Sequence, residues 1–141
     1  MSEPLRLLIV DDEALARLRL KSLLQSLPEA GAVVVGEAGD ADSALSLLQA
    51  VPADAVLLDI RLPGRDGLRL AAAMQALPQP PAVVFVTAHA EHALKAFELE
   101  AVDYLTKPVR RERLLAALQR VKQRLRPAPE PLPEGPALVV N

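Results

Sequence analysis

The stretch that most constrains the fold is AVLLDIRLPGRDG at residues 55–67, where an apolar run ends in one carboxylate and a turn rich in Pro and Gly follows. A run this apolar indicates a strand that is buried on both faces, which is typical of a parallel sheet. Asp59, at the carboxyl end of that strand, lies where open α/β sheets bind ligands. Asp is also common at strand ends as a simple turn residue. The rest of the chain therefore has to decide between a chemical and a structural role for Asp59.

Short apolar runs alternate with segments of helical periodicity along the first 125 residues. This alternation predicts a doubly wound α/β domain, a five-stranded parallel sheet with right-handed crossovers and helices on both faces. Asp40 is the expected N-cap of the second helix, which ends before Pro52. In the first helix, the apolar stripe that we expect to face the core consists of residues 15, 18, 23, 24 and 27. The predicted strands are 5–10, 32–35, 55–58, 82–86 and 102–105, and the other predicted helices are 14–27, 68–77, 92–99 and 109–125.

Composition limits the possible functions. Apolar residues make up 51% and aromatic residues 2% of the 141-residue chain, which is enough for one sizeable aliphatic core. The net charge of −2 argues against a basic nucleic-acid binder, and the lack of Cys excludes disulfides, thiol catalysis and Cys-ligated zinc. The apolar runs are too short to cross a membrane and the N-terminus has no signal-peptide pattern, so we expect a cytoplasmic protein.

The composition changes after residue 125. Five prolines fall between Pro127 and Pro136 without helical periodicity, and such a stretch is typical of a semi-extended linker. We therefore expect one domain at residues 1–125, followed by a Pro-rich linker or tail at 126–141.

Side chains that carry chemistry follow four of the predicted strands. Asp11 and Asp12 follow the first strand, Asp59 the third, Thr87 the fourth and Lys107 the fifth. The carboxyl ends of parallel strands share one edge of a sheet, so these residues should meet in one crevice. Crowded carboxylates need a cation, and hard oxygen ligands select Mg²⁺ or Mn²⁺. Together with an ammonium and a hydroxyl, they suit phosphoryl transfer to an aspartate, with the central Asp59 as nucleophile.

These residues carry a family resemblance. The chain resembles the receiver domain of a bacterial two-component response regulator from residue 5 to about residue 125, which implies the flavodoxin-like (βα)5 fold with strand order 2-1-3-4-5. Each motif is weak alone, but their order and spacing together are specific. The matching motifs are Val10-Asp11-Asp12-Glu13, Leu57-Leu58-Asp59-Ile60 with Pro63 and Asp66-Gly67, Val86-Thr87-Ala88, and Asp103-Tyr104-Leu105-Thr106-Lys107-Pro108.

The resemblance implies roles for the residues around Asp59. Asp59 would accept a phosphoryl group from the phosphohistidine of a sensor histidine kinase. Asp12, Asp59 and the backbone carbonyl of Arg61 would bind Mg²⁺, or Mn²⁺, and Asp11 would act on the metal through water. Lys107 would contact the phosphoryl group. The family match thus implies a switch and not an enzyme, without turnover beyond self-phosphorylation and autodephosphorylation.

The resemblance also implies a switch around the phosphoryl group. Thr87 would close on that group, the small Ala88 would leave access to it, and Tyr104 would turn inward as Thr87 moves. The peptide bond between Lys107 and Pro108 would be cis. His89, two residues after Thr87, and Arg61, two after Asp59, are candidates for tuning the loss of the phosphoryl group.

A narrower resemblance covers residues 93–108, which are similar to receivers of the LytR/AlgR type. Those receivers carry a mostly β DNA-binding domain after a linker, so DNA binding would need a domain outside this sequence. The surface of helix 92–99, strand 102–105 and helix 109–125 would change its affinity for partners and form a homodimer. Across that dimer the basic residues of the last helix could pair with Glu91, Glu98 and Glu100; the basic residues are Arg110, Arg111, Arg113, Arg120, Lys122, Arg124 and Arg126.

Two other functions fit the same fold. An aspartate-nucleophile phosphohydrolase also places Asp at a strand end, but it usually carries a second Asp two residues later, where this chain has Arg61. A flavin or nucleotide carrier would need a Gly-rich phosphate loop after the first strand, and aspartates stand there instead. His89 and His92 are close in sequence, but we interpret them as a solvated pair and not as a metal site.

Overall fold

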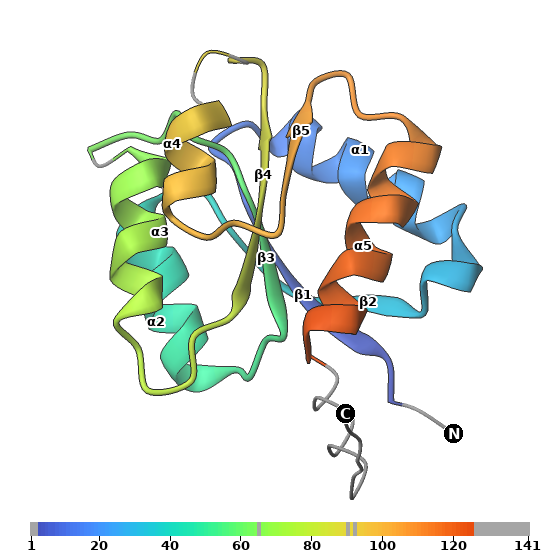
Figure 1. The fold of residues 1–141 in the computed structure, drawn as a ribbon, viewed down its shortest axis with the longest axis horizontal. Helices are drawn as coiled ribbons and strands as arrows, with labels where there is room; N and C mark the ends of the chain where they lie inside the picture. The colour runs from blue at the N-terminus through green and yellow to red at the C-terminus, as the bar shows by residue number, and fades with distance from the viewer. Residues whose placement is uncertain (1–2, 65, 90, 92, 126–141) are drawn as a thin grey trace, which may run out of the picture.

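The centre of the fold is a five-stranded parallel sheet in the order β2-β1-β3-β4-β5 (Figure 1), as predicted. The structure is a computed structural model that describes residues 3–64, 66–89, 91 and 93–125. The strands are β1 (Leu5–Val10), β2 (Ala32–Ala38), β3 (Ala55–Leu58), β4 (Ala82–Thr87) and β5 (Asp103–Thr106). The helices are α1 (Ala14–Gln25), the short 3-10 helix η1 (Pro28–Ala30), α2 (Ala41–Ala50), α3 (Gly67–Gln75), α4 (Ala93–Glu98) and α5 (Arg111–Leu125).

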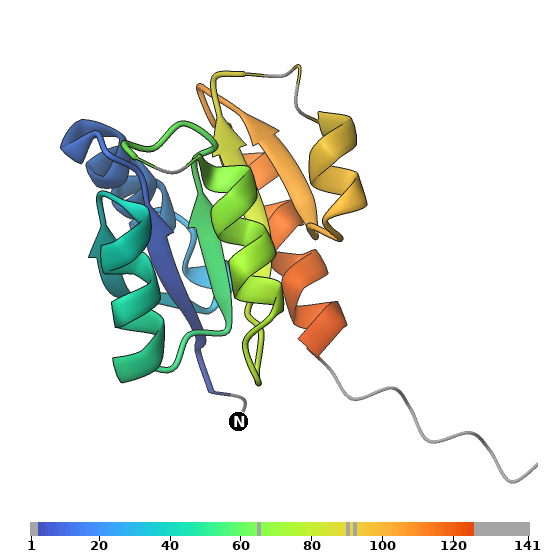
Figure 2. The same cartoon turned by 90° about the vertical axis from the view of Figure 1, so that its left-hand side faces the viewer.

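Helices cover both faces of the sheet. Figure 1 shows α1 and α5 on one side and α2, α3 and α4 on the other, and Figure 2 turns the second group toward the viewer. The four residues of β3 are all buried and alternate between two apolar cores. Ala55 and Leu57 pack with α1 and α5, whereas Val56 and Leu58 pack with α2, α3 and α4. Burial on both faces explains why the sequence of β3 is uninterrupted by polar residues.

The predicted core stripe of α1 is wrong in its N-terminal half. Leu15 and Leu18 are 57% and 56% exposed, whereas Leu20 and Leu24 are buried and Leu27 is buried in the turn that follows. At about 100° per residue, positions 15 and 18 lie nearly opposite positions 20 and 24 on the helix. The face of α1 that meets the core therefore carries Leu20 and Leu24 with the partly buried Leu23, whereas the predicted stripe began at Leu15 and omitted Leu20.

Element ends differ from the prediction by a few residues. Strand β2 continues to Ala38 instead of ending at Val35, because it pairs with β1 as far as Val10 and a register shift lies between Leu7 and Leu8. Several other ends differ by one or two residues: α1 ends at residue 25, α3 spans 67–75, α4 spans 93–98, β4 ends at 87, β5 spans 103–106, and α5 begins at 111. His92 and the predicted linker at 126–141 lie outside the described residues.

Side-chain caps fix where two helices begin. The Asp40 carboxylate accepts a hydrogen bond from the Ser43 backbone N–H at 2.8 Å, which confirms the predicted N-cap of α2. The Asp66 carboxylate accepts from the Arg69 N–H at 2.8 Å and caps α3 in the same way. Such caps satisfy amide groups that a helix leaves unpaired at its first turn. Within the described part of the chain, the helices are too short or too polar to cross a membrane.

Candidate functional site

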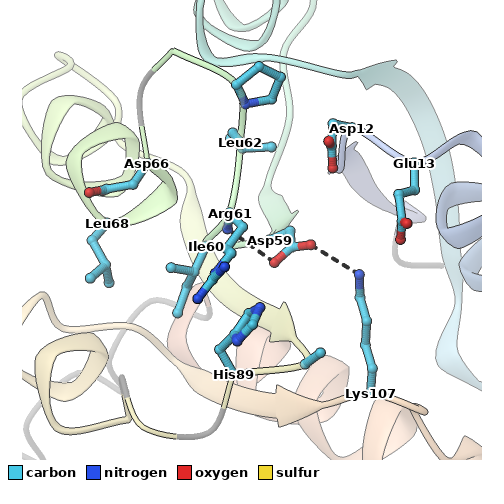
Figure 3. A pocket seen from close by; sticks show the side chains of 12 residues that line it. Asp12, Glu13, Asp59, Ile60, Arg61, Leu62, Asp66, Leu68, His89 and Lys107 are labelled. Carbon is cyan, nitrogen blue, oxygen red and sulfur yellow. Dashed lines mark hydrogen bonds and ion pairs between the residues drawn. The ribbon is translucent and has the colours of Figure 1, made fainter.

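Three of the residues predicted to meet at the carboxyl edge of the sheet, Asp12, Asp59 and Lys107, line one hollow there (Figure 3). Asp11 is bonded to Lys107 beside it, whereas Thr87 is buried and does not line the hollow. Strands β1, β3 and β4 run in register, with Val10 opposite Leu58 and Leu58 opposite Phe85, so that the residues after them emerge together. A hollow of about 680 Å³ opens at this edge. Its lining consists of Asp12, Glu13, Asp59, Ile60, Arg61, Leu62, Pro63, Asp66, Leu68, Ala88, His89 and Lys107.

Lys107 joins two carboxylates that are far away in sequence. Its Nζ lies 2.7 Å from Asp11 Oδ2 and 3.0 Å from Asp59 Oδ2, across sequence separations of 96 and 48 residues. The side chains of Asp11 and Asp59 are 1% and 9% exposed, and that of Lys107 is 22% exposed. The strand end is fixed by the Lys107 N–H, which donates to the Thr87 carbonyl at 2.8 Å, and the peptide bond to Pro108 is cis as expected.

The environment sets the ionisation of this group of residues. Burial raises the pKa of Asp11, although hydrogen bonds from Lys107 and from the Glu13 N–H favour its ionised form. Burial alone would lower the pKa of Lys107, but its hydrogen bonds to Asp11 and Asp59 outweigh burial and raise it. The ammonium therefore stays charged at neutral pH and holds both carboxylates in place.

The three aspartates of the site have the geometry and chemistry of a hard-cation site. Asp11, Asp12 and Asp59 each offer a carboxylate oxygen, and these oxygens lie within 4.8 Å of one another. Asp11 and Asp59 are buried, whereas Asp12 is exposed and lines the hollow. Oxygen ligands with one solvent-facing side suit Mg²⁺ or Mn²⁺, which keep several waters. The predicted role of the Arg61 carbonyl as a metal ligand stays a prediction. The backbone N–H of Arg61 donates a hydrogen bond to Asp59 Oδ1 at 3.3 Å.

The loop after β3 depends on a glycine at its far end. The Gly67 N–H donates to the Ile60 carbonyl, which folds the loop back onto the strand end. A Cβ at position 67 would lie 2.7 Å from Ile60 Cα and closer still to the Asp59 carbonyl oxygen. Both neighbours are backbone atoms, so only glycine lets the chain pass this close to Asp59.

Thr87, His89 and Tyr104 form a connected group beside the hollow. Thr87 is buried, and its Oγ1 accepts a hydrogen bond from the His89 N–H at 3.2 Å. The Tyr104 hydroxyl donates to the His89 carbonyl, and its ring centroid lies 6.2 Å from that of Phe85. Both backbone groups of His89 are thus held by the residues predicted to switch. Ala88 is exposed and lines the hollow, and its predicted role in leaving access to Asp59 stays a prediction.

A second cluster next to the site was not predicted. Arg17 of α1 donates from Nη1 to the Asp11 backbone carbonyl at 2.5 Å and from Nε to Glu37 Oε1 at 3.0 Å. Lys21 donates to the other oxygen of Glu37 at 2.7 Å. Residues 17 and 37 are separated by 20 positions on different elements, and no periodic pattern in the sequence connects them.

Comparison with known proteins gives consistent matches. The family model described as "Response regulator receiver domain" matches residues 7–119. The chain is 48% identical over 119 residues to the positive alginate biosynthesis regulatory protein of Pseudomonas aeruginosa, and 41% identical over 119 residues to the sensory transduction protein LytT of Bacillus subtilis. Each alignment covers 84% of this chain and 48% of the relative, so the chain spans about half the length of these relatives.

Solved structures agree with the sequence relatives. The crystal structure of the response regulatory domain of protein mrkE from Klebsiella pneumoniae matches with a TM-score of 0.75 at 37% identity, covering 85% of this chain and 97% of that one. A CheY-like response regulator receiver domain from Methylobacillus flagellatus matches with a TM-score of 0.75 at 30% identity, covering 84% and 99%.

Proposed function

This chain belongs to the response regulator receiver domain family, and on that premise we propose that Asp59 accepts a phosphoryl group from the phosphohistidine of a sensor histidine kinase. One observation carries the proposal: Lys107 Nζ bridges Asp11 and Asp59 at 2.7 and 3.0 Å beside an open hollow. An ammonium in that position supports a carboxylate that must remain ionised to act as a nucleophile, and it offers a positive charge to an arriving phosphoryl oxygen.

The proposed transfer uses the side chains of the hollow in turn. A carboxylate oxygen of Asp59 attacks phosphorus, the bond from phosphorus to the histidine nitrogen breaks, and Asp59 becomes an acyl phosphate. Lys107 keeps its contact with Asp11 and pairs with a phosphoryl oxygen. Asp12, Asp59 and the Arg61 carbonyl would hold Mg²⁺, with Asp11 acting through water. When bound, Mg²⁺ supplies positive charge that offsets the charge on the transferred group.

Intact mass spectrometry with acetyl phosphate and Mg²⁺ tests the proposal. We expect a labile gain of one phosphoryl group that Asp59→Asn abolishes. Asp66→Asn is the matched control, because Asp66 lines the same hollow and asparagine also caps helices well. The control should gain the group as the wild type does. Lack of an adduct together with rapid turnover of assorted phosphomonoesters would contradict the switch and favour a phosphohydrolase.

We propose that the lifetime of the adduct is tuned from two sides of the hollow. His89 and the exposed Arg61 both line it. Either side chain can obstruct or orient the water that attacks the acyl phosphate. Substituting each with alanine should change the decay rate of the adduct without abolishing its formation. An unchanged decay rate in both variants would remove these residues from the proposal.

The proposed switch follows from the contacts of His89. If Thr87 turns toward the phosphoryl group, its hydroxyl leaves the His89 N–H, and the loop held by Tyr104 must adjust. The loop leads directly into α4, so the change would reach the surface made by α4, β5 and α5. Comparing amide chemical shifts with and without beryllofluoride, a phosphoryl mimic, should show changes at Thr87, Tyr104 and α4. Chemical-shift changes confined to the residues that line the hollow would contradict the proposed switch.

We propose that the α4, β5 and α5 surface forms the activated homodimer. Leu94 and Phe97 of α4 are 72% and 78% exposed, and their i, i+3 spacing places them together on one face of the helix as an exposed apolar patch. Within one chain Arg113 and Arg120 pair with Asp103, and Arg124 pairs with Glu100. Predicted pairing of these three arginines with Glu91, Glu98 and Glu100 of a second copy therefore requires exchange of these contacts. That exchange suits an interface that forms only on activation.

Sedimentation with and without beryllofluoride tests the dimer. Phe97→Ser should keep the activated chain monomeric, whereas Leu18→Ser, which removes an exposed leucine from α1, should not. A wild type that stays monomeric at high micromolar concentration with the mimic would refute the interface.

The relatives also suggest what the phosphorylated domain controls. Because the chain spans about half their length, we propose that in a longer protein it controls a C-terminal DNA-binding domain through the predicted linker at 126–141, and thereby regulates transcription. DNA binding would reside in that domain. The same proposal places the chain in the cytoplasm, where the kinase transfers its phosphoryl group.

A further inference from the structure

We infer that Arg17 is a positioning residue that fixes the acid loop, defined as residues 11–13, so that Asp12 is preorganised to bind Mg²⁺. The inference rests on the proposed metal site but not on the proposed phosphoryl transfer. Arg17 itself donates to the backbone of the loop and is absent from the residues that line the hollow. Any effect on the metal would therefore pass through the loop.

The backbone of the acid loop is held on several sides. The Asp11 N–H donates to the Ala38 carbonyl at 3.0 Å, and the Asp11 carbonyl accepts from Arg17 at 2.5 Å. The Asp11 carboxylate accepts from the Glu13 N–H at 2.9 Å, which closes the loop on itself. Asp12 lies between these anchored residues. Among the described residues, none donates a hydrogen bond to the Asp12 carboxylate, so its position depends on the backbone.

The guanidinium of Arg17 is itself held by the sheet edge. Its Nε donates to Glu37 of β2 at 3.0 Å, and its side chain is 21% exposed. A planar guanidinium offers two directed donors, one for the loop carbonyl and one for the carboxylate, which an ammonium cannot supply in the same geometry. Arg17 thus joins α1, the acid loop and β2, three elements whose relative position decides where Asp12 points.

Two explanations of the role of Arg17 predict opposite changes in Mg²⁺ affinity when Arg17 is removed. If Arg17 acted only as a positive charge near the aspartates, removing it would tighten Mg²⁺ binding, because repulsion of the cation would fall. If Arg17 positions the loop, removing it would weaken binding, because the ligands would have to be ordered when the cation binds. Arg17→Lys separates the two further, since it keeps the charge and loses the paired donors.

The test measures the Mg²⁺ dissociation constant by titration followed in amide chemical shifts, without any phosphoryl donor. We expect Arg17→Met and Arg17→Lys both to weaken binding roughly tenfold, the lower end of what outer-shell partners of metal sites contribute. Glu37→Gln should weaken it less, because Arg17 keeps its bond to the loop. Arg19→Met is the matched charge control on α1; its side chain is exposed, and its loss should leave binding unchanged or slightly tighter.

Lys21→Met separates the loop contact from the carboxylate contact. Lys21 binds the same Glu37 carboxylate at 2.7 Å but makes no hydrogen bond to the acid loop. We expect its loss to lower thermal stability slightly and to leave the Mg²⁺ affinity as in the wild type.

Unchanged or tighter Mg²⁺ binding in Arg17→Met would overturn the inference, and so would full affinity in Arg17→Lys. If Arg17→Met does not fold, Arg17→Lys still decides the outcome, because it keeps the charge and loses the paired donors. Failure of the proposed function is distinguishable: a wild type that binds Mg²⁺ but gains no phosphoryl group refutes the transfer to Asp59 and leaves the Arg17 result interpretable.

Discussion

Removing the Lys107 ammonium should destabilise the metal-free protein and enlarge the stabilisation that Mg²⁺ provides. In Lys107→Met, the carboxylates of Asp11 and Asp59 lose the cation that lies 2.7 and 3.0 Å away, while their side chains stay 1% and 9% exposed. At an effective dielectric constant of about 20, a charge pair at such a distance attracts by roughly 6 kcal/mol before desolvation is counted.

The net cost is smaller than the Coulomb attraction. Leaving a buried charge without its partner costs about 3–5 kcal/mol, and the 22% exposure of Lys107 points to the lower end. We expect the free energy of unfolding to fall by about 3 kcal/mol, or the melting temperature by roughly 12 °C for a domain of this size. Methionine keeps most of the aliphatic volume, so the loss reports the charge.

The assay is urea unfolding in chelator and then in saturating Mg²⁺. Magnesium at about 100 times its dissociation constant stabilises a folded protein by roughly 2.7 kcal/mol. In the variant Mg²⁺ no longer competes with an ammonium for Asp59, so its stabilisation should exceed that of the wild type. Lys122→Met is the matched control: Lys122 is a half-buried lysine without an ion-pair partner among the described residues, and its loss should change stability by less than about 0.5 kcal/mol.

The pH dependence gives a second check on the same variant. Burial already raises the pKa of Asp11 above 3.8, and loss of the ammonium raises it further. When the folded-state pKa of a carboxyl group is raised above its unfolded value of 3.8, protonation of that group favours the folded state. This contribution to the free energy of unfolding is complete below pH 3.8 and is lost as the pH rises through the folded-state pKa. The difference in the free energy of unfolding between wild type and variant should therefore become smaller in acid. A variant as stable as the wild type in chelator at pH 7, or an equal Mg²⁺ effect in both, would refute the reasoning.

Three further predictions test the fold around the site. Gly67→Ala should lower the free energy of unfolding by about 3 kcal/mol, because its Cβ meets backbone atoms that cannot move aside; urea unfolding measures this, and a neutral result would contradict it. Tyr104→Phe should cost about 1 kcal/mol, the usual net value of one hydrogen bond, and should speed amide exchange in the loop before α4; unchanged exchange would contradict the contact. Hydrogen bonds from Lys21 and then Arg17 lower the pKa of Glu37 below 4.5, so its contribution to stability is full above 4.5 and lost as the pH falls. The difference between wild type and Glu37→Gln in urea unfolding should therefore shrink from pH 7 to pH 3, and a constant difference would refute the assignment.

The sequence predicts most of the fold because local pattern and topology agree. The apolar run at residues 55–58 needs cover on both faces, and alternating helices supply it, so the parallel sheet follows from few assumptions. The order and direction of the strands then place Asp11, Asp59 and Lys107 at one edge of the sheet, and this can be predicted before any distance between them is measured. The prediction of their convergence is confirmed because chain direction in a parallel sheet leaves no other edge for them.

What the sequence did not predict lies where tertiary contacts override local pattern. The exposure of Leu15 and Leu18 depends on which face of α1 meets the sheet, and leucines occur on more than one face of this helix, so their spacing alone did not identify that face. The end of β2 depends on how far its partner β1 runs, with a register shift between them. The contact between Arg17 and Glu37 joins two surface-type residues from different elements, and such pairs have no periodicity by which to recognise them.

The three aspartates of the site show why the pattern of residues alone could not assign their roles. In the sequence, Asp11 and Asp12 are neighbouring residues of the same type. In the structure, Asp11 is 1% exposed and bound by Lys107, whereas Asp12 is exposed in the hollow. The backbone is held on both sides of Asp11, at its N–H by the Ala38 carbonyl and at its carbonyl by Arg17, and Asp12 follows directly after this anchored residue. If Arg17 were released, Asp11 would keep its ammonium partner, whereas Asp12 would lose the backbone that aims it. A metal site with one fixed and one loose carboxylate binds weakly even though every ligand is present, so the affinity for Mg²⁺ should depend on Arg17, which does not line the hollow.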